Sequence, residues 1–471
     1  MIKTDICVIG AGSGGLSVAA GAVQMGAKVV LCEGSKMGGD CLNYGCVPSK
    51  AMIEASRIIA NTQKAKNLGI EVLGINADYK KVQQHVKSVI AKIEPHDSVE
   101  RFEGLGVEVI QDFGEVVDSH TVKAGDKIIK AKYIVIATGS SASIPPINGL
   151  NEVEYLTNET IFEVVDKPKR LLVIGGGPIG IELAQAHVLL GCEVTVFEVS
   201  DSVLTMVEKD CRKIVVDELK SQGIKIITKA DIEKVVTENN EKVIYCNGER
   251  FTGSDILVAA GRKPNLSKLG LDDANINYTP KGIVVDNRLR TNHKNIFAIG
   301  DVTGGYQFTH VAGYQAGIVI QNILFKLPAK VGYTSLPWSI YTTPEIAHVG
   351  ISIEQAIKQG AKILEISYAD NDRAQAGLDT KGLVKVAVDK KGYILSATIV
   401  GKSSSELITQ WTIAIKNKLK IKAMASHIVA YPTLSELNKR VAGSYFTPTL
   451  YSPKVKKIVR FMMKVFGKKI C

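Results

Sequence analysis

Apolar and polar positions alternate along the first two thirds of the chain in blocks that predict strands and helices in turn. Short, nearly continuous apolar runs are typical of strands buried on both faces of a parallel sheet. Such runs occur at residues 5–9, 28–33, 132–140, 170–174, 193–198 and 255–260. From residue 338 onward the pattern changes to shorter strands alternating with helices. The sequence therefore predicts an α/β protein with more than one domain.

The first two apolar runs enclose a glycine turn and a helix of small residues. Gly10, Gly12 and Gly15 satisfy the spacing G-x-G-x-x-G, and Glu33 ends the second strand 23 residues after Gly10. These glycines permit a tight turn, close approach of the backbone to a pyrophosphate, and close packing of helix on strand. The acid can accept hydrogen bonds from an adenosine ribose. We expect residues 5–33 to bind a dinucleotide.

A second unit of the same kind follows the strand at residues 170–174. Its turn places Gly175, Gly177 and Gly180 at the same spacing, and Glu198 ends the next strand 23 residues on. Two such fingerprints predict two dinucleotides bound by one chain. A carboxylate at this point binds a free ribose and repels a 2′-phosphate, so the sequence favours NADH over NADPH.

Length and composition agree with a soluble multidomain protein. A chain of 471 residues is too long for one hydrophobic core, which predicts two to four domains. No run of eighteen apolar residues occurs, so no membrane-spanning segment is expected. The chain begins directly with a predicted strand and shows no secretory signal, which predicts a cytoplasmic protein.

The net charge of +11 is concentrated at the end of the chain. Residues 452–471 carry seven basic side chains and no acidic one, so the remaining 451 residues carry 11 − 7 = +4. No nucleic-acid motif accompanies this charge, and no nucleic-acid partner is expected.

Two of the eight cysteines stand five residues apart, in the stretch GGDCLNYGCVPSK at residues 38–50. A helix is predicted from Ala51 onward, just after them, and a helix N-terminus favours the thiolate form of a nearby cysteine. Because only a thiolate attacks a disulfide, Cys41 and Cys46 could interchange between dithiol and disulfide. The other cysteines show no framework spacing, so a structural disulfide set is not expected.

The stretch at residues 38–50 resembles the redox-active disulfide of the class I flavoprotein disulfide reductases, which include dihydrolipoamide dehydrogenase, glutathione reductase and mercuric reductase. The resemblance implies FAD and NAD as cofactors, with Cys46 against the flavin as the charge-transfer thiol and Cys41 as the interchange thiol. It also implies that Lys50 and Glu182 form an ion pair beside the flavin, although either side chain could be exposed to solvent.

The resemblance extends over nearly the whole chain. The segment ATGS, with Gly139, resembles the exit from the family's flavin domain, and AAGRKPN, with Gly261, resembles the return from its NAD domain. The segment ending in Asp301 resembles the second FAD motif, in which this acid binds the ribityl chain. The family pattern implies two Rossmann-like dinucleotide-binding domains plus an α+β dimerisation domain, and a homodimer whose active sites are shared between subunits. The expected boundaries are residues 1–148 and 270–332 for a discontinuous FAD domain, 149–269 for the NAD domain, 333–450 for the dimerisation domain and 451–471 for a basic tail.

The chain departs from the family near its end. Dihydrolipoamide dehydrogenase and glutathione reductase use a His-Pro dipeptide, five residues before a glutamate, for acid–base catalysis. Here Tyr431 replaces the histidine, while Pro432 and Glu436 remain. A phenol near pKa 10 exchanges protons poorly at neutral pH, so Tyr431 and Glu436 are candidate catalytic residues of altered chemistry. His427 lies four residues upstream, where the family has no catalytic histidine, and we expect it to be structural.

Mercuric reductase resembles the chain at this point, because it also carries a tyrosine there. A soft metal held by thiolates needs no histidine base. The chain nevertheless lacks that enzyme's N-terminal metal-binding domain and its paired C-terminal cysteines, since only Cys471 stands at the tail. No resident metal site is expected.

Three functions remain open from the sequence. The first is an NADH-dependent FAD oxidoreductase that reduces a thiol, disulfide or soft-metal acceptor. The second is a dihydrolipoamide dehydrogenase in which Tyr431 compensates for the histidine. The third is a redox protein of the membrane surface that reduces a protein or a quinone.

The basic tail motivates the third function. Apolar residues recur at helical spacing from Val455 to Phe466, and lysines and Arg460 gather on the opposite side. Such a helix could bind the headgroups of an anionic membrane through residues 454–469, at the inner face of the membrane. Alternatively, its apolar face could pack on the dimer.

Overall fold

The computed structural model describes residues 1–467, which form two compact units. The first comprises residues 1–204 and 220–332, and the second comprises residues 205–219 and the chain from Tyr333 onward. Lys468, Lys469 and Cys471, which the sequence analysis placed in the basic tail, lie outside the described residues. Two parallel-type sheets in the first unit and an antiparallel sheet in the second agree with the α/β fold expected from the sequence.

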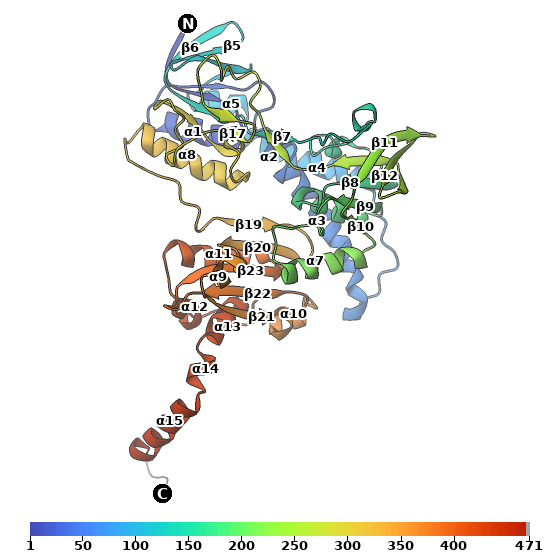
Figure 1. Ribbon diagram of the computed structural model, residues 1–471, viewed down its shortest axis with the longest axis vertical. Coiled ribbons are helices and arrows are strands. Elements are labelled where there is room, and N and C mark those ends of the chain that lie inside the picture. The colour runs from blue at the N-terminus through green and yellow to red at the C-terminus, as the bar shows by residue number, and fades with distance from the viewer. Residues whose placement is uncertain (468–471) are drawn as a thin grey trace. The chain divides into compact units, whose positions relative to one another are not determined.

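The first unit begins with a mostly parallel sheet (Figure 1). Its parallel strands lie in the order β3 (Glu108–Ile110), β2 (Val29–Cys32), β1 (Ile2–Ile9), β6 (Lys127–Ile136) and β18 (Ile296–Ala298). The antiparallel β5 (Thr121–Ala124) pairs with the first half of β6, on the same edge that β18 pairs further along, and β4 (Gly114–Asp118) pairs with β5. The whole second sheet separates β18 from β6 in the sequence, so a late segment of the chain completes this early sheet.

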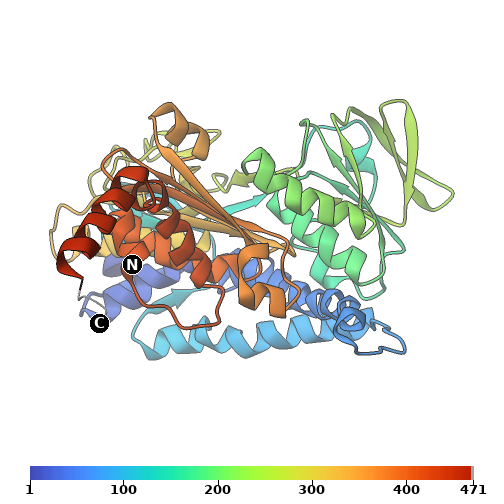
Figure 2. The ribbon, with the colours of Figure 1, turned by 90° about the horizontal axis from the view of Figure 1, so that it is seen from below.

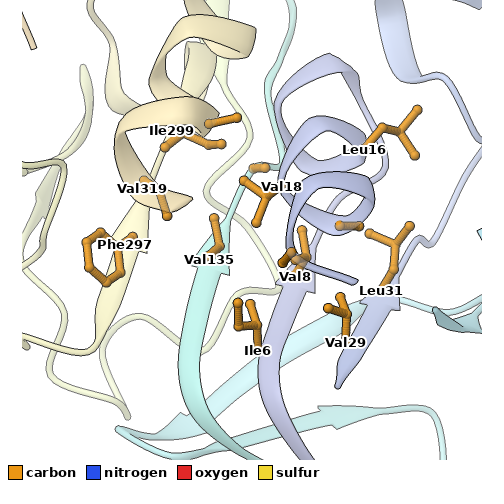
Figure 3. Close-up of a cluster of buried hydrophobic side chains, with 14 of the residues drawn as sticks. Ile6, Val8, Leu16, Val18, Val29, Leu31, Val135, Phe297, Ile299 and Val319 are labelled. Carbon is orange, nitrogen blue, oxygen red and sulfur yellow. The ribbon is translucent and has the colours of Figure 1, made fainter. Parts of the chain in front are cut away.

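Two helices cover one face of this sheet and pack against each other. They are α1 (Ser13–Gln24) and α8 (Thr309–Ile323). Figure 3 shows Val18 of α1 and Val319 of α8 on either side of Val135 from β6, within one buried apolar cluster. Gly21 of α1 faces the side chain of Ile320, where a Cβ atom would overlap it. Small residues in α1 therefore permit the close contact, and each buried Val or Leu contributes about 1.5–3 kcal/mol.

A second parallel sheet carries the second glycine turn. Its strands lie in the order β10 (Lys225–Thr228), β9 (Glu193–Glu198), β8 (Arg170–Ile174) and β14 (Asp255–Val258), and α6 (Pro178–Leu189) follows β8. An antiparallel meander of β11 (Ile232–Glu238), β12 (Glu241–Cys246) and β13 (Glu249–Gly253) packs nearby. Its two turns, Asn239-Asn240 and Asn247-Gly248, have positive φ at both central residues, as tight β-hairpins require.

The cysteine stretch forms two helices rather than a loop before one. The short helix α2 (Gly39–Asn43) contains Cys41, and α3 (Cys46–Gln63) begins at Cys46, five residues earlier than the sequence predicted. Pro48 lies in the first turn of α3, where a missing N–H costs nothing. Helix α4 (Tyr79–Ile93) runs along α3 (Figure 2). Its buried Tyr79 hydroxyl lies 3.1 Å from Nε2 of the buried His187 on α6.

The second unit is built on an antiparallel sheet. Its strands lie in the order β19 (Pro337–Ile340), β20 (Glu345–Gly350), β23 (Ile394–Gly401), β22 (Leu383–Val388) and β21 (Lys362–Ser367). The packed helices include α7 (Lys209–Ser221), α11 (Ser404–Lys416), α12 (Ile421–Ser426) and α13 (Glu436–Ser444). The fully buried Trp411 anchors α11 to α13, because its Nε1 donates a 2.8 Å hydrogen bond to Asn438.

Short elements complete the chain. They are α5 (Val99–Gly104), α9 (Ile353–Lys358), α10 (Asp372–Ala376), α14 (Thr447–Leu450), β7 (Ser140–Ala142), β15 (Arg262–Pro264), β16 (Tyr278–Thr279) and β17 (Gly282–Ile283). The last helix, α15 (Pro453–Phe466), contains the amphipathic stretch of the tail. Among the helices of residues 1–467, none is both long and apolar enough to cross a membrane.

Candidate active site

The cysteine-bearing segment, residues 39–46, which we call the redox turn, lies directly on the first glycine turn. Gly39 has φ of +57°, and a Cβ atom there would lie 2.7 Å from Cα of Gly12. The nearby Gly38 N–H donates a 3.0 Å hydrogen bond to the Ala11 carbonyl. The redox turn is therefore fixed, backbone against backbone, beside the turn that the sequence assigns to a dinucleotide.

The pKa values of the two cysteine thiols are shifted in opposite directions. Both are thiols in this structure, Cys46 exposed and Cys41 partly buried. The pKa of Cys46 is lowered to about 6, first by a hydrogen bond from the Cys41 thiol and then by the Thr309 hydroxyl and the Lys50 charge, against the effect of burial. The same hydrogen bond and burial raise the pKa of Cys41 well above its ordinary value. At neutral pH the pair is therefore a Cys46 thiolate that accepts a hydrogen bond from a Cys41 thiol.

Two further features favour the thiolate form of Cys46. Oγ1 of Thr309, the first residue of α8, lies 3.3 Å from Sγ of Cys46. Cys46 is also the first residue of α3, so the positive end of the helix dipole favours its charge. Thr309 was not singled out by the sequence analysis, because it lies 263 residues from Cys46.

Lys50 and Glu182 form an ion pair with a distance of 2.9 Å between Nζ and Oε2. Lys50 lies one turn after Cys46 on α3, and Glu182 is buried on α6. The pair thus joins the helix of the redox turn to the helix of the second glycine turn. A half-buried, hydrogen-bonded pair of this kind places a cation close to the thiolate.

The two glycine turns are built alike. In the first, Glu33 accepts hydrogen bonds from the backbone N–H groups of Ala11 (2.6 Å) and Ser35 (2.7 Å). In the second, Glu198 accepts them from Gly176 (2.7 Å) and Ser200 (2.8 Å). Burial raises the pKa of Glu33. Each carboxylate is therefore held at the end of its strand, beside its own glycine turn.

The backbone of each turn suits a bound pyrophosphate. A Cβ atom on Gly15 or Gly180 would overlap the carbonyl of the first glycine of its turn, Gly10 or Gly175, so helix and strand need a glycine there. Beside the middle glycines, Gly12 and Gly177, no atom of the described residues lies within 4 Å of an ideal Cβ position, and each precedes the first turn of a helix. Open space above a helix N-terminus is the arrangement that cradles phosphate oxygens. These residues fit the pyrophosphate of one dinucleotide at each turn.

A cluster of polar side chains links the redox turn to the return of the chain from the second sheet. The guanidinium of Arg262 lies 3.1 Å from Asp40, the residue before Cys41, and donates a 2.7 Å hydrogen bond to Oγ of Ser140. Ser140 in turn donates a 2.6 Å hydrogen bond to Asp301, whose pKa is raised by burial. The sequence analysis named Asp301 but missed Asp40, Ser140 and Arg262.

The backbone around this cluster is made possible by two glycines that the sequence singled out. Gly139 and Gly261 both have positive φ, and their flanking strands β7 and β15 pair antiparallel. Within the described part of the chain, nothing lies within 4 Å of a Cβ position on either glycine. Ser140 and Arg262 are the first residues of these two short strands, and the Arg262 side chain extends along the pair to Ser140.

A cavity of about 340 Å³ lies beside the redox turn. Its lining consists of Ser13, Leu16, Ser17, Ala20, Asp97, Arg101 and Phe102. Ser13 relates it to the redox turn, because its hydroxyl is one of the groups that act on the pKa of the Cys41 thiol. Sequence patterns gave no signal for this cavity, since its walls come from α1 and from the region of α5, which are distant in the sequence.

Tyr431 and Glu436 belong to the second compact unit, whereas both cysteines belong to the first. The exposed Tyr431 hydroxyl donates a 3.0 Å hydrogen bond to Asp372, which raises the pKa of Tyr431. Glu436 is the first residue of α13. Tyr431 is therefore a protonated hydrogen-bond donor at neutral pH and not a base. His427 is bound through Nδ1 to the Met424 carbonyl at 2.8 Å.

Metal binding by clustered side chains is not indicated. Within residues 1–467 no group of three or more His, Cys, Asp or Glu side chains could hold a metal ion.

Two family models match the chain. Residues 4–316 match the pyridine nucleotide-disulphide oxidoreductases, and residues 336–442 match the dimerisation domain of the same family.

Curated relatives of the chain carry two different activities. The dihydrolipoyl dehydrogenase of Geobacillus stearothermophilus is 35% identical over 456 residues, which is 94% of this chain and 96% of that protein. The mercuric reductase of Staphylococcus aureus is 32% identical over 449 residues, which is 94% of this chain and 82% of that protein.

Solved structures agree in fold. The Cu(II) complex of the HOCl-induced flavoprotein disulfide reductase RclA from Escherichia coli superposes with a TM-score of 0.86 at 26% identity, over 94% of this chain and 100% of that one. LpdA from Mycobacterium tuberculosis superposes with a TM-score of 0.86 at 25% identity, over 94% and 100% of the two chains.

The thiolate assignment predicts a pH-dependent reactivity at Cys46. In a Cys41→Ser variant stripped of cofactor, the serine hydroxyl still donates to Cys46, so its alkylation rate should rise with pH around a midpoint near 6. Adding Lys50→Met should move the midpoint up by roughly one pH unit, because a nearby cation is lost. Peptide mass spectrometry after timed alkylation measures both. Lys66→Met, an exposed lysine just beyond α3, is the control; a midpoint that ignores Lys50 would contradict the assignment.

Proposed function

This chain belongs to the pyridine nucleotide-disulphide oxidoreductases, and from that premise we propose that it carries electrons from NADH to a soft metal ion or a disulfide through the Cys41–Cys46 pair. It is a flavin-dependent enzyme that uses a pyridine nucleotide, and its dimerisation domain supports a homodimer. FAD, when bound at the first glycine turn, passes electrons between the pyridine nucleotide and the disulfide. The observation that carries the proposal is the position of Cys41 and Cys46 directly beside the first glycine turn, with Cys46 at the start of α3 and 3.3 Å from Oγ1 of Thr309.

The proposed roles of the two cysteines follow from their acidities. Cys46, with its low pKa, keeps a stable negative charge beside the first glycine turn and acts as the charge-transfer thiol. Cys41 keeps its proton until an acceptor arrives, and Ser13 connects it to the cavity of about 340 Å³. We propose that the acceptor enters this cavity and meets Cys41 as the interchange thiol.

We propose that polar side chains of the site bind the two cofactors and balance the charge of the reduced flavin. The Lys50–Glu182 pair places positive charge where a reduced flavin would carry negative charge. Asp301, held by Ser140, would bind the ribityl chain, and Glu33 and Glu198 would bind the two adenosine riboses. The proposed domains keep the boundaries expected from the sequence, with residues 149–269 inserted into the FAD domain.

The proposed acceptor class rests on Tyr431. Disulfide exchange in the histidine-bearing relatives requires proton transfer, and general acid–base catalysis contributes about 10²–10⁴-fold. Tyr431 is held protonated by Asp372 and cannot accept that proton. A soft metal ion instead displaces the proton shared by Cys41 and Cys46, which leaves to solvent without a base. The mercuric reductase relatives and the neighbour solved as a Cu(II) complex favour this chemistry.

Two other acceptors are distinguished by the same assay. A dihydrolipoamide dehydrogenase activity is favoured by the relatives of nearly equal length. Reduction of a membrane-bound protein or quinone is favoured by the basic tail. NADH oxidation measured in parallel with mercuric ion, Cu(II), lipoamide, glutathione disulfide and a quinone decides among them, and turnover with lipoamide alone at high rate would contradict the metal proposal.

The cysteine roles predict opposite spectra for two variants of the FAD-loaded enzyme. Anaerobic reduction with NADH should give a long-wavelength charge-transfer band that comes from the Cys46 thiolate. Cys46→Ser should abolish the band, whereas Cys41→Ser should show it without any reductant, because Cys46 is then permanently free of the disulfide. The band should fade as pH falls below about 6, where the thiolate is protonated. A band that survives Cys46→Ser would reverse the assignment.

The position of Glu198 predicts the nucleotide preference. Glu198→Ala should lower the ratio of kcat/KM for NADH to that for NADPH by about tenfold or more, because ribose hydrogen bonds are lost and charge repulsion of the 2′-phosphate is removed. Steady-state kinetics with both nucleotides measure the ratio. Glu193→Ala, at the exposed start of the same strand, should leave it unchanged. If the wild type already prefers NADPH, the proposed specificity is wrong.

Placing the family's histidine at position 431 is predicted to raise the rate of disulfide reduction. Tyr431→His should raise lipoamide or small-disulfide reduction by up to about 100-fold, because an imidazole exchanges protons near neutral pH. Tyr431→Phe, which removes only the hydroxyl, should leave metal reduction nearly unchanged. Loss of metal reduction in Tyr431→Phe would show that the hydroxyl itself touches the acceptor.

A further inference from the structure

Helix α15 presents an apolar face that no other segment of the described chain covers. Its apolar side chains are between 47% and 78% exposed: Ile458, Val459, Phe461, Met462, Met463, Val465 and Phe466. The match to the dimerisation domain ends at residue 442, before α15 begins. Helix α15 therefore lies outside the part of the chain that matches the dimerisation domain.

The helix has its own start signal. Ser452 caps it by accepting a 3.3 Å hydrogen bond from the Val455 N–H, and Pro453 occupies the first turn. A capped start followed by fourteen helical residues is a defined element rather than an irregular chain end. Helices of this length are nevertheless marginal in water without a surface to pack on.

The charges on α15 also indicate that this helix needs a surface to bind. Lys456, Arg460 and Lys464 follow one another at intervals of four residues and so line one face, next to Lys457. Like charges at this spacing repel, and cations near a helix N-terminus oppose its dipole. No acidic residue occurs from 452 to 471 to compensate them. An anionic surface would remove this repulsion.

We propose that α15 binds the headgroup region of an anionic lipid bilayer, with its apolar face toward the acyl chains and its basic face toward the lipid phosphates. Charge complementarity favours this occupant, because lipid phosphates would neutralise the basic face, whereas two copies of α15 packed by their apolar faces would leave both basic faces uncompensated. The helix then lies in the plane of the surface and does not cross the membrane. This inference goes beyond the proposed reaction, since it holds whichever acceptor the enzyme reduces. In a cell it places the enzyme at the inner face of the membrane, whose lipids are anionic.

Vesicle co-sedimentation of the full chain tests the proposal. The enzyme should pellet at low salt with vesicles containing phosphatidylglycerol, stay in the supernatant with pure phosphatidylcholine vesicles, and be released by high salt. A chain ending at Tyr451 should not pellet with either. Its NADH oxidation rate should equal that of the full chain, which shows that the truncated protein is folded.

Two matched triple variants test whether the position of the basic residues on α15, and not only the total charge of the protein, determines binding. Lys456→Gln, Arg460→Gln and Lys464→Gln together should lower the partition coefficient on anionic vesicles about 100-fold, since each basic residue contributes about fivefold near the surface. Lys281→Gln, Lys390→Gln and Lys391→Gln remove the same charge from exposed sites elsewhere and should lower it little.

If something other than a lipid bilayer covers the apolar face of α15, these experiments give different results. Equal sedimentation of the full and truncated chains, or an equal loss in both triple variants, would overturn the proposal. So would a full chain that stays in the supernatant with anionic vesicles. If light scattering shows that the chain ending at Tyr451 loses the dimer mass while the full chain ignores vesicles, the apolar face of α15 is a subunit contact.

Discussion

The close approach of Gly39 to Gly12 sets the geometry on which the active site depends. Two backbone turns meet with no side chain between them, and this contact brings the cysteines beside the first dinucleotide turn. Any Cβ atom at Gly39 would force the turns apart, and its φ of +57° already disfavours other residues. Electron transfer between a bound ring system and a thiolate needs contact, so this glycine pair controls chemistry without taking part in it.

Around that contact, charge is distributed along the helices that start there. The N-terminus of α3, Lys50 on its next turn and the Thr309 hydroxyl all favour negative charge on Cys46. Arg262 lies 3.1 Å from Asp40 and holds the residue beside Cys41 to β15, the strand that follows the second parallel sheet. The site is therefore assembled from four separate stretches of the first unit, each held by a specific polar contact.

The part of this arrangement that could be predicted from the sequence is the local part. The glycine turns, with Glu33 and Glu198 at fixed spacing, follow from backbone geometry within a single strand–turn–helix–strand unit, and the cysteine pair follows from its own motif. The Lys50–Glu182 ion pair was expected only from the family resemblance. Other contacts between distant segments could not be predicted: Thr309 with Cys46, Arg262 with Asp40, and the cavity between α1 and the region of α5 leave no periodic signal. The start of α3 was placed at residue 51 because the glycines and Pro48 suggest a loop, whereas proline is well tolerated in a first helical turn. The partner of Tyr431, Asp372, lies 59 residues away and was likewise not foreseen.

The pairing of an acidic thiol with a protonated neighbour also determines how the enzyme meets oxidants. Thiolates are the thiols that peroxides attack, so Cys46, the more acidic thiol of the pair, is more open than Cys41 to conversion into a sulfenic acid. Cys41 is already hydrogen-bonded to that sulfur, and its thiol condenses with the sulfenic acid to form the disulfide and water. The product is the same disulfide that the reductive half of the catalytic cycle opens. In the proposed reaction, oxidation of Sγ of Cys46 therefore leads to the disulfide form of the enzyme, and irreversible over-oxidation of this sulfur is avoided.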